Sequence, residues 1–140
     1  MKTERGFSLI EILLVVAVLG IITAAAIPGL RKAKQTAETA SAVSSMRTIT
    51  TAQILYFRKA DTYGTLAELA PEGTLDPAIG VGQKSGYAFV LTVDSTQKKF
   101  TCTASPIGDT QTMFFFVDET TVIRFNSGAP ADVNSPPIPR

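Results

Sequence analysis

The sequence contains no histidine, no tryptophan and a single cysteine, Cys102. Histidine is the commonest general base near neutral pH and a frequent metal ligand, so its absence argues against hydrolytic chemistry and against a metal site. One cysteine excludes a disulfide within these residues and leaves the redox compartment undefined. The formal net charge is only +1, which predicts no nucleic-acid partner. We therefore expect no enzyme and no cofactor.

Charge is also scarce near the N-terminus. Residues 7–30, FSLIEILLVVAVLGIITAAAIPGL, contain one charged side chain, Glu11. As a helix this segment would be about 36 Å long, enough to cross the roughly 30 Å hydrocarbon core of a bilayer. Basic residues flank it on both sides, so the positive-inside rule does not select an orientation: Lys2 and Arg5 before it, and Arg31, Lys32 and Lys34 after it.

Two common kinds of apolar segment do not account for Glu11. A secretory signal peptide could be cut in the small-residue run 23–26, and a plain N-terminal anchor needs only the apolar length. A carboxylate inside an apolar run costs a few kcal/mol or more unless it is paired, on the order given for membrane interiors. No cation lies within one helical turn of Glu11. Its partner must therefore come from elsewhere.

The run Gly6-Phe7-Ser8-Leu9-Ile10-Glu11 resembles the class III leader and cleavage motif of type IV pilins and pseudopilins. The resemblance implies that residues 1–6 are a leader and that a prepilin peptidase and methyltransferase cuts after Gly6 on the cytoplasmic side. The same enzyme would then methylate the new N-terminal residue, Phe7. Glu11 occupies the fifth position after the cut, where the family carries a glutamate.

The resemblance also supplies a partner for Glu11. Cleavage would free the amine of Phe7, and in the family this amine is thought to pair with the glutamate of a neighbouring subunit. Opposite charges in a low-dielectric core favour meeting each other over remaining bare, so Glu11 is expected to set subunit register. Gly20 and Pro28 stand where the family often softens the helix, although both residue types are common in membrane helices in any case.

The rest of the chain predicts an α+β fold of the type IV pilin kind, in which one long N-terminal helix packs on a four-stranded antiparallel sheet. From Phe7 to Lys59 the helix would be about 80 Å long. Residues 7–30 would form its hydrophobic transmembrane and polymerisation half, and residues 31–60 its amphipathic half. The expected apolar face of the second half consists of Ala33, Ala37, Ala40, Val43, Met46 and Ile49.

Within the expected globular head, residues 31–140, glycines and prolines mark residues 61–84 as an αβ-loop. Thr65 could cap a short helical turn that extends to Ala70. Residues 85–125 predict a β-meander, and residues 126–140 a proline-rich tail that is extended or partly disordered. The four expected strands are 87–93, 99–104, 112–117 and 121–125.

Two further features of the head are interpreted conservatively. Cys102 shares a strand face with apolar neighbours and is expected to be a buried, inert thiol, with an intersubunit disulfide as the alternative. Asp118 and Glu119 form the one adjacent pair of carboxylates and are expected to be solvated in a turn.

These observations predict a structural subunit of a type IV pilus that polymerises with identical copies through its N-terminal helix. Its expected partners are the prepilin peptidase, the inner-membrane pilus assembly machinery and the membrane itself. It would lie in the cytoplasmic membrane before assembly and in an extracellular pilus afterwards. One alternative is a pseudopilin of type II secretion, in a periplasmic pseudopilus. Major pseudopilins often bind calcium through a C-terminal acidic loop, and here the tail has only Asp132. A membrane-anchored binding protein or minor pilin is the alternative from another class.

Overall fold

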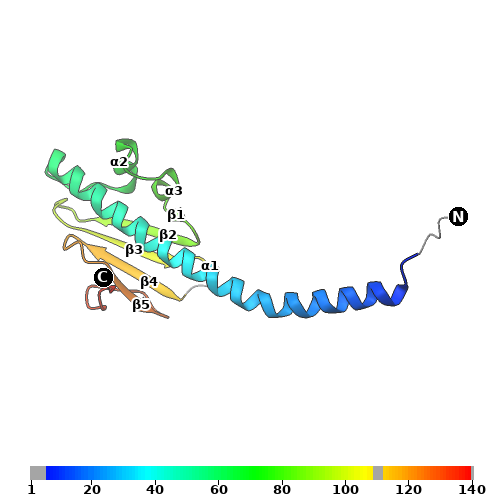
Figure 1. Cartoon of the computed structure of the whole chain (residues 1–140). Helices are drawn as coiled ribbons and strands as arrows, with labels where there is room; N and C mark the ends of the chain where they lie inside the picture. The colour runs from blue at the N-terminus through cyan, green and yellow to red at the C-terminus, as the bar shows by residue number, and fades with distance from the viewer. Residues whose placement is uncertain (1–5, 109–111, 140) are drawn as a thin grey trace. The chain divides into compact units, whose positions relative to one another are not determined.

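The computed structural model describes residues 6–108 and 112–139, so the predicted leader lies outside it except for Gly6. The chain divides into two compact units, residues 1–34 and 35–140. One long helix, α1, spans Leu9–Ala60, and Figure 1 shows the order of the elements that follow. The short helices are α2 (Leu66–Leu69), η1 (Ala70–Glu72) and α3 (Pro77–Gly80). The strands are β1 (Gln83–Lys84), β2 (Tyr87–Val93), β3 (Phe100–Pro106), β4 (Met113–Asp118) and β5 (Arg124–Ser127).

The second half of α1 buries one face. No glycine or proline occurs between Leu30 and Tyr63, and two cations, Arg58 and Lys59, stand in the last turn, where the helix dipole favours them. The buried residues recur every three or four positions, as one face of a helix requires. They are Ala42, Ser45, Met46, Ile49, Thr50, Ala52 and Gln53.

The predicted apolar face was correct at Met46 and Ile49 and wrong at Ala33, Ala37 and Ala40, which are exposed. Alanine loses little by exposure, so the two large side chains determine which face turns inward. Polar residues can share that face because their hydroxyls bond within the helix. Ser45 donates to the Ser41 carbonyl at 2.9 Å, and Thr50 donates to the Met46 carbonyl at 2.8 Å.

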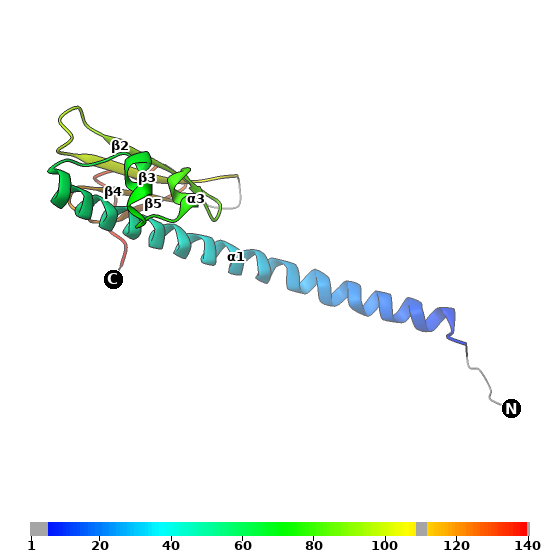
Figure 2. The same ribbon diagram turned by 90° about the horizontal axis from the view of Figure 1, so that it is seen from above.

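The strands form one antiparallel sheet in the order β1-β2-β3-β4-β5. Figures 1 and 2 both show residues 35–60 of α1 lying along one face of this sheet, so the head has two layers. The core between them joins the buried helix residues to alternate side chains of β2, β3 and β4. These strand residues are Tyr87, Phe89, Phe100, Cys102, Ala104, Phe115 and Val117.

The long helix packed on an antiparallel meander confirms the α+β prediction, but the sheet has five strands rather than four. The additional strand, β1, lies at the end of the expected loop and pairs with Tyr87 and Ala88 of β2. Ser85 and Gly86 connect the two strands, both with positive φ (50° and 77°), as a tight type I′ hairpin requires. A strand of two polar residues carries no hydrophobic alternation, so its sequence did not predict it.

The αβ-loop is anchored to α1 by a buried amide. The side chain of Gln53 donates to the Gly64 carbonyl at 2.6 Å and accepts from the Gly64 amide at 3.0 Å. Glu68 accepts from the Thr65 amide at 2.7 Å, which confirms the predicted capped turn at α2. The loop therefore leaves the helix in a defined direction.

The tail, expected to be extended or partly disordered, pairs in part with the sheet. The Phe125 amide donates to the Pro136 carbonyl at 2.9 Å, and the Ile138 amide donates to the Ile123 carbonyl at 3.0 Å. The intervening Pro137 forms an isolated bridge with Arg124. Proline is tolerated at a sheet edge because no further strand needs its missing amide. The extended conformation was predicted correctly, and its pairing to the sheet was not.

Candidate functional site

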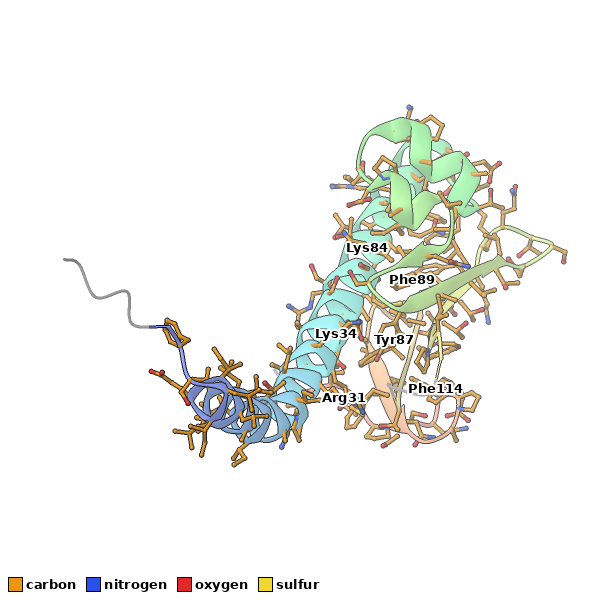
Figure 3. All side chains as sticks on the ribbon, turned by 90° about the vertical axis from the view of Figure 1, so that its right-hand side faces the viewer. Arg31, Lys34, Lys84, Tyr87, Phe89 and Phe114 are labelled. Atoms are coloured by element: carbon orange, nitrogen blue, oxygen red, sulfur yellow. The ribbon has the colours of Figure 1, made fainter. Side chains whose placement is uncertain are left out.

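The candidate functional site is the apolar first half of α1, because its side chains are exposed in the isolated chain. Its large hydrophobic side chains are between 45% and 78% exposed. Figure 3 shows these side chains projecting around the helix rather than from a single face. They are Phe7, just before the helix, and, within it, Leu9, Ile10, Ile12, Leu13, Leu14, Val15, Val16, Val18, Leu19, Ile21, Ile22, Ile27 and Leu30.

A surface of this kind needs an apolar environment from outside the chain. Fully burying one large aliphatic side chain is worth about 1.5–3 kcal/mol, so more than a dozen exposed together amount to a strong driving force. Within the described residues, α1 is the one helix long and apolar enough to cross a membrane. Its most apolar 18-residue window has a mean hydropathy of 2.7 and no buried residue. Length and composition therefore permit either lipid or other protein helices as the cover.

The predicted cleavage residues lie just before this helix. Gly6 and Phe7 are exposed and precede the first residue of α1, Leu9. Phe7 is 78% exposed, and an added Cβ at Gly6 would meet no atom within 4 Å. The predicted bond therefore lies in exposed backbone before the helix begins.

Glu11 stands in the first turn of α1, where the Ser8 carbonyl accepts from its amide at 3.0 Å. The unpaired amides of a helix N-terminus favour a negative charge at this place. Among residues 6–108 and 112–139, none forms an ion pair with the Glu11 carboxylate. The carboxylate is exposed and free to accept a cation from outside the described chain.

The helix runs unbroken through Gly20 and Pro28, the two residues predicted to soften it. Pro28 has no amide hydrogen, so the Ala24 carbonyl lacks its usual partner. Sequence reasoning did not single out Thr23, whose hydroxyl donates to the Leu19 carbonyl at 2.7 Å. Such bonds to the carbonyl four residues earlier slightly destabilise and often bend helices, and a threonine inside the apolar run is the signal that could have found it.

In the described part of the head, Cys102 and the pair Asp118 and Glu119 are the candidates for chemistry. Cys102 is fully buried, its sulfur lies 3.8 Å from that of Met46, and burial raises the pKa of its thiol to about 12. This confirms the buried, inert thiol and places it out of reach of another subunit's cysteine. Asp118 is buried and accepts from the Thr120 amide at 3.0 Å, so the expectation that it is solvated was wrong.

Asp132, the acidic residue of the tail, is already engaged. Its Oδ1 accepts from the Asn134 amide at 3.0 Å and from the Ser135 hydroxyl at 2.9 Å. These bonds lower the pKa of the carboxyl, the Ser135 hydroxyl contributing most. The geometry is that of a turn stabilised by its own side chain.

Comparison with known proteins matches the N-terminal segment to one family and the chain to two relatives. The family described as the prokaryotic N-terminal methylation motif matches residues 1–27. The type IV major pilin protein PilA of Myxococcus xanthus (strain DK1622) is 38% identical over 72 residues, which cover 49% of this chain and 33% of that protein. The type II secretion system core protein G of Escherichia coli (strain K12) is 30% identical over 95 residues.

The second alignment covers 65% of this chain and 66% of the protein G sequence. The chain thus spans a third of the length of the first relative and just under two thirds of the second.

Proposed function

The chain belongs to the type IV pilin and pseudopilin family, and on this premise we propose that it is the structural subunit of a type IV pilus. It is cut after Gly6, methylated on Phe7 and polymerised through residues 7–30. Its role is mechanical rather than enzymatic. The observation that carries the proposal is the exposed apolar half of α1, which no part of the described chain covers.

The proposed steps from membrane to filament follow from the two apolar environments, lipid and other copies, that can cover the first half of α1. Before assembly, lipid of the cytoplasmic membrane surrounds it and the head stands in the periplasm. After the prepilin peptidase removes the leader, the inner-membrane assembly machinery moves it from lipid into contact with other copies. Contact with both environments is apolar, so the transfer requires little change in hydration, and polar contacts decide the register.

Glu11 is the residue that we propose sets this register. Its carboxylate is exposed and has no cationic partner within the described chain, whereas cleavage creates a cationic amine four residues earlier in every copy. Within one copy both groups lie at the same helix end. In a stack of copies displaced along the axis, the amine of one can approach the carboxylate of the next, which removes two bare charges from an apolar bundle.

A pseudopilus subunit of type II secretion is the second candidate. It is supported by the longer alignment with protein G, which covers more of this chain than the alignment with PilA does. The hydrogen bonds of Asp132 support the pilus instead. They engage the acidic residue of the tail within its own turn, whereas major pseudopilins often use acidic residues in this region to bind calcium.

Intact-mass spectrometry of two fractions separates these candidates. Material sheared from the cell surface and the washed membrane fraction are measured from the same cells. A chain that begins at methylated Phe7 in the sheared material supports the pilus. The same processed chain confined to membranes supports the pseudopilus. A chain that retains Met1 in both fractions, or one cut near residue 26, would contradict the proposal.

A further inference from the structure

Three cations follow the apolar segment within four positions: Arg31, Lys32 and Lys34, here called the basic collar. All three are exposed on α1, and Figure 3 labels two of them, Arg31 and Lys34. The sequence contains no acidic residue between Glu11 and Glu38. The collar is therefore the one cluster of charged residues between Glu11 and Glu38. Polymerisation through apolar contacts does not require these cations.

The distance from Glu11 to the collar matches a bilayer. Arg31 follows Glu11 by 20 positions, which is about 30 Å along an α-helix. The hydrocarbon core of a bilayer is also about 30 Å thick. The uncharged residues 12–30 can thus span the hydrocarbon, with Glu11 at one boundary and the collar at the other.

The collar also has the dimensions of a headgroup layer. From Arg31 to Lys34 the helix rises only about 4.5 Å, whereas each polar layer of a bilayer is roughly 5–7 Å deep. At 100° per residue the three side chains spread over about 160° of the helix circumference. A single carboxylate on a neighbouring helix could meet one of them. A surrounding layer of phosphates can meet all three.

We propose that the basic collar binds anionic phospholipid headgroups while the chain is stored in the membrane. This inference rests on the proposed function, which places residues 7–30 in a bilayer. On that orientation the collar lies on the side of the head, not in the cytoplasm. The positive-inside rule therefore does not explain it, and a ligand on that side does.

Glu38 reduces the excess charge without cancelling it. It lies four positions after Lys34, a spacing at which helical side chains interact. Counting Arg31, Lys32, Lys34 and Glu38, residues 31–38 carry +3 and −1, a net charge of +2. At the anionic cytoplasmic leaflet each nearby cation increases membrane binding roughly fivefold, and the same electrostatic attraction applies in any leaflet that contains anionic phospholipid.

Site-specific lipid capture tests the collar. The full chain is reconstituted in nanodiscs of phosphatidylcholine with one fifth phosphatidylglycerol, with photo-reactive benzoylphenylalanine in place of the exposed Ala33. The ratio of phosphatidylglycerol to phosphatidylcholine adducts is then measured by mass spectrometry. The variant R31Q/K32Q/K34Q is compared with the matched control R47Q/R58Q/K99Q, which removes three exposed cations of the head.

The proposal expects adducts of the parent chain to be enriched in phosphatidylglycerol by about fivefold or more over the bulk ratio. Enrichment should disappear in the collar variant, persist in the control and weaken at high salt, where exposed charges are screened. Three results would overturn the proposed lipid binding by the collar. They are a parent ratio equal to the bulk ratio, equal losses of enrichment in both variants, and adducts to a second copy instead of lipid. Failure of the parent chain to insert would overturn the membrane-stored state itself, which separates the two inferences.

Discussion

The two halves of α1 have the same helical backbone but differ in whether their large hydrophobic side chains are buried within the chain. In residues 9–30 the large hydrophobic side chains are exposed all round, whereas Met46 and Ile49 in the second half are fully buried. The second half is the less hydrophobic of the two, and it is the half that contributes to a core. Hydrophobic content alone therefore does not make a core. What matters is whether the same chain supplies a complementary surface, and the sheet supplies one for residues 42–53.

Because of this difference, the two halves of α1 stabilise different states of the protein. Burial in the head contributes to the free energy of folding of every copy, in any environment. Burial of the first half is available only from lipid or from other copies, so it contributes to insertion and assembly. A substitution should accordingly affect one property and spare the other, and the following predictions test that separation.

The largest effect is expected from Phe115→Ala. Phe115 is 2% exposed and its ring centre lies 5.9 Å from that of Tyr87. Removing a buried aromatic ring costs about 3–5 kcal/mol through lost burial and the cavity that remains. Thermal unfolding of the head in detergent micelles should show a large decrease in Tm.

Phe7→Ala is the matched control for Phe115→Ala, because it removes the same ring from a side chain that is 78% exposed. The Tm of the head should then stay within error of the parent chain. A comparable decrease for both variants would mean that the two halves of α1 do not stabilise separate properties.

Glu11→Ala should have the next largest effect, and on assembly alone. An amine left unpaired in an apolar bundle costs several kcal/mol, on the order measured for broken buried ion pairs. Filament yield from sheared cells should fall at least about tenfold, while the Tm of the head is unchanged. Glu119→Ala, which removes a carboxylate of the head, serves as the control. Normal yield from the Glu11 variant would eliminate its role in register.

Gln53→Met should produce a moderate loss of stability. The substitution keeps the length of a fully buried side chain but leaves the Gly64 amide and carbonyl without partners. Leaving buried polar groups unsatisfied costs about 1–3 kcal/mol. Gln83→Met, at an exposed position of β1, provides the control. Equal Tm values for the two variants would show that the buried amide does not hold the loop.

The smallest expected effect is a pH dependence confined to the head. A bond from the Thr65 amide lowers the pKa of Glu68, and a bond from the Ala78 amide lowers the pKa of Asp76. Because the folded-state pKa values lie below the ordinary ones, the unfolded chain binds protons first as the pH falls. Their contribution is present above pH 4.5 and is lost as the pH falls through the folded-state values.

Thermal unfolding from pH 7 to pH 3 measures this contribution. The double variant Glu68→Gln and Asp76→Asn should show a shallower decrease in Tm over that range than the parent chain. Parallel curves for the two proteins would show that these carboxyls contribute nothing to the acid sensitivity of the head.

Features that depend on one continuous stretch of residues were predictable from the sequence. The motif from Gly6 to Glu11, the apolar run 7–30 and the absence of breakers up to Tyr63 each lie within one stretch, and together they predicted a long helix with an apolar first half. The strand-like run 87–93 predicted β2 with its observed bounds. Local patterns of this kind follow from the regular repeats of the helix and the strand, so they can be recognised from neighbouring residues alone.

Features that depend on contacts between elements were decided by the tertiary structure. The sheet selects which helix face turns inward, so Ala33, Ala37 and Ala40 are exposed while Gln53 is buried. The edge of β2 gives two polar residues, Gln83 and Lys84, the hydrogen bonds that make them a strand. The edge of β5 orders the proline-rich tail in the same way. In each case a segment outside the element supplies the missing contact. The sequence by itself determined the long helix, the strands β2, β3 and β4, and the need of residues 7–30 for an apolar environment, because each lies in one local pattern. Packing decided which faces meet and made residues 83–84 a strand, because both depend on contacts between elements.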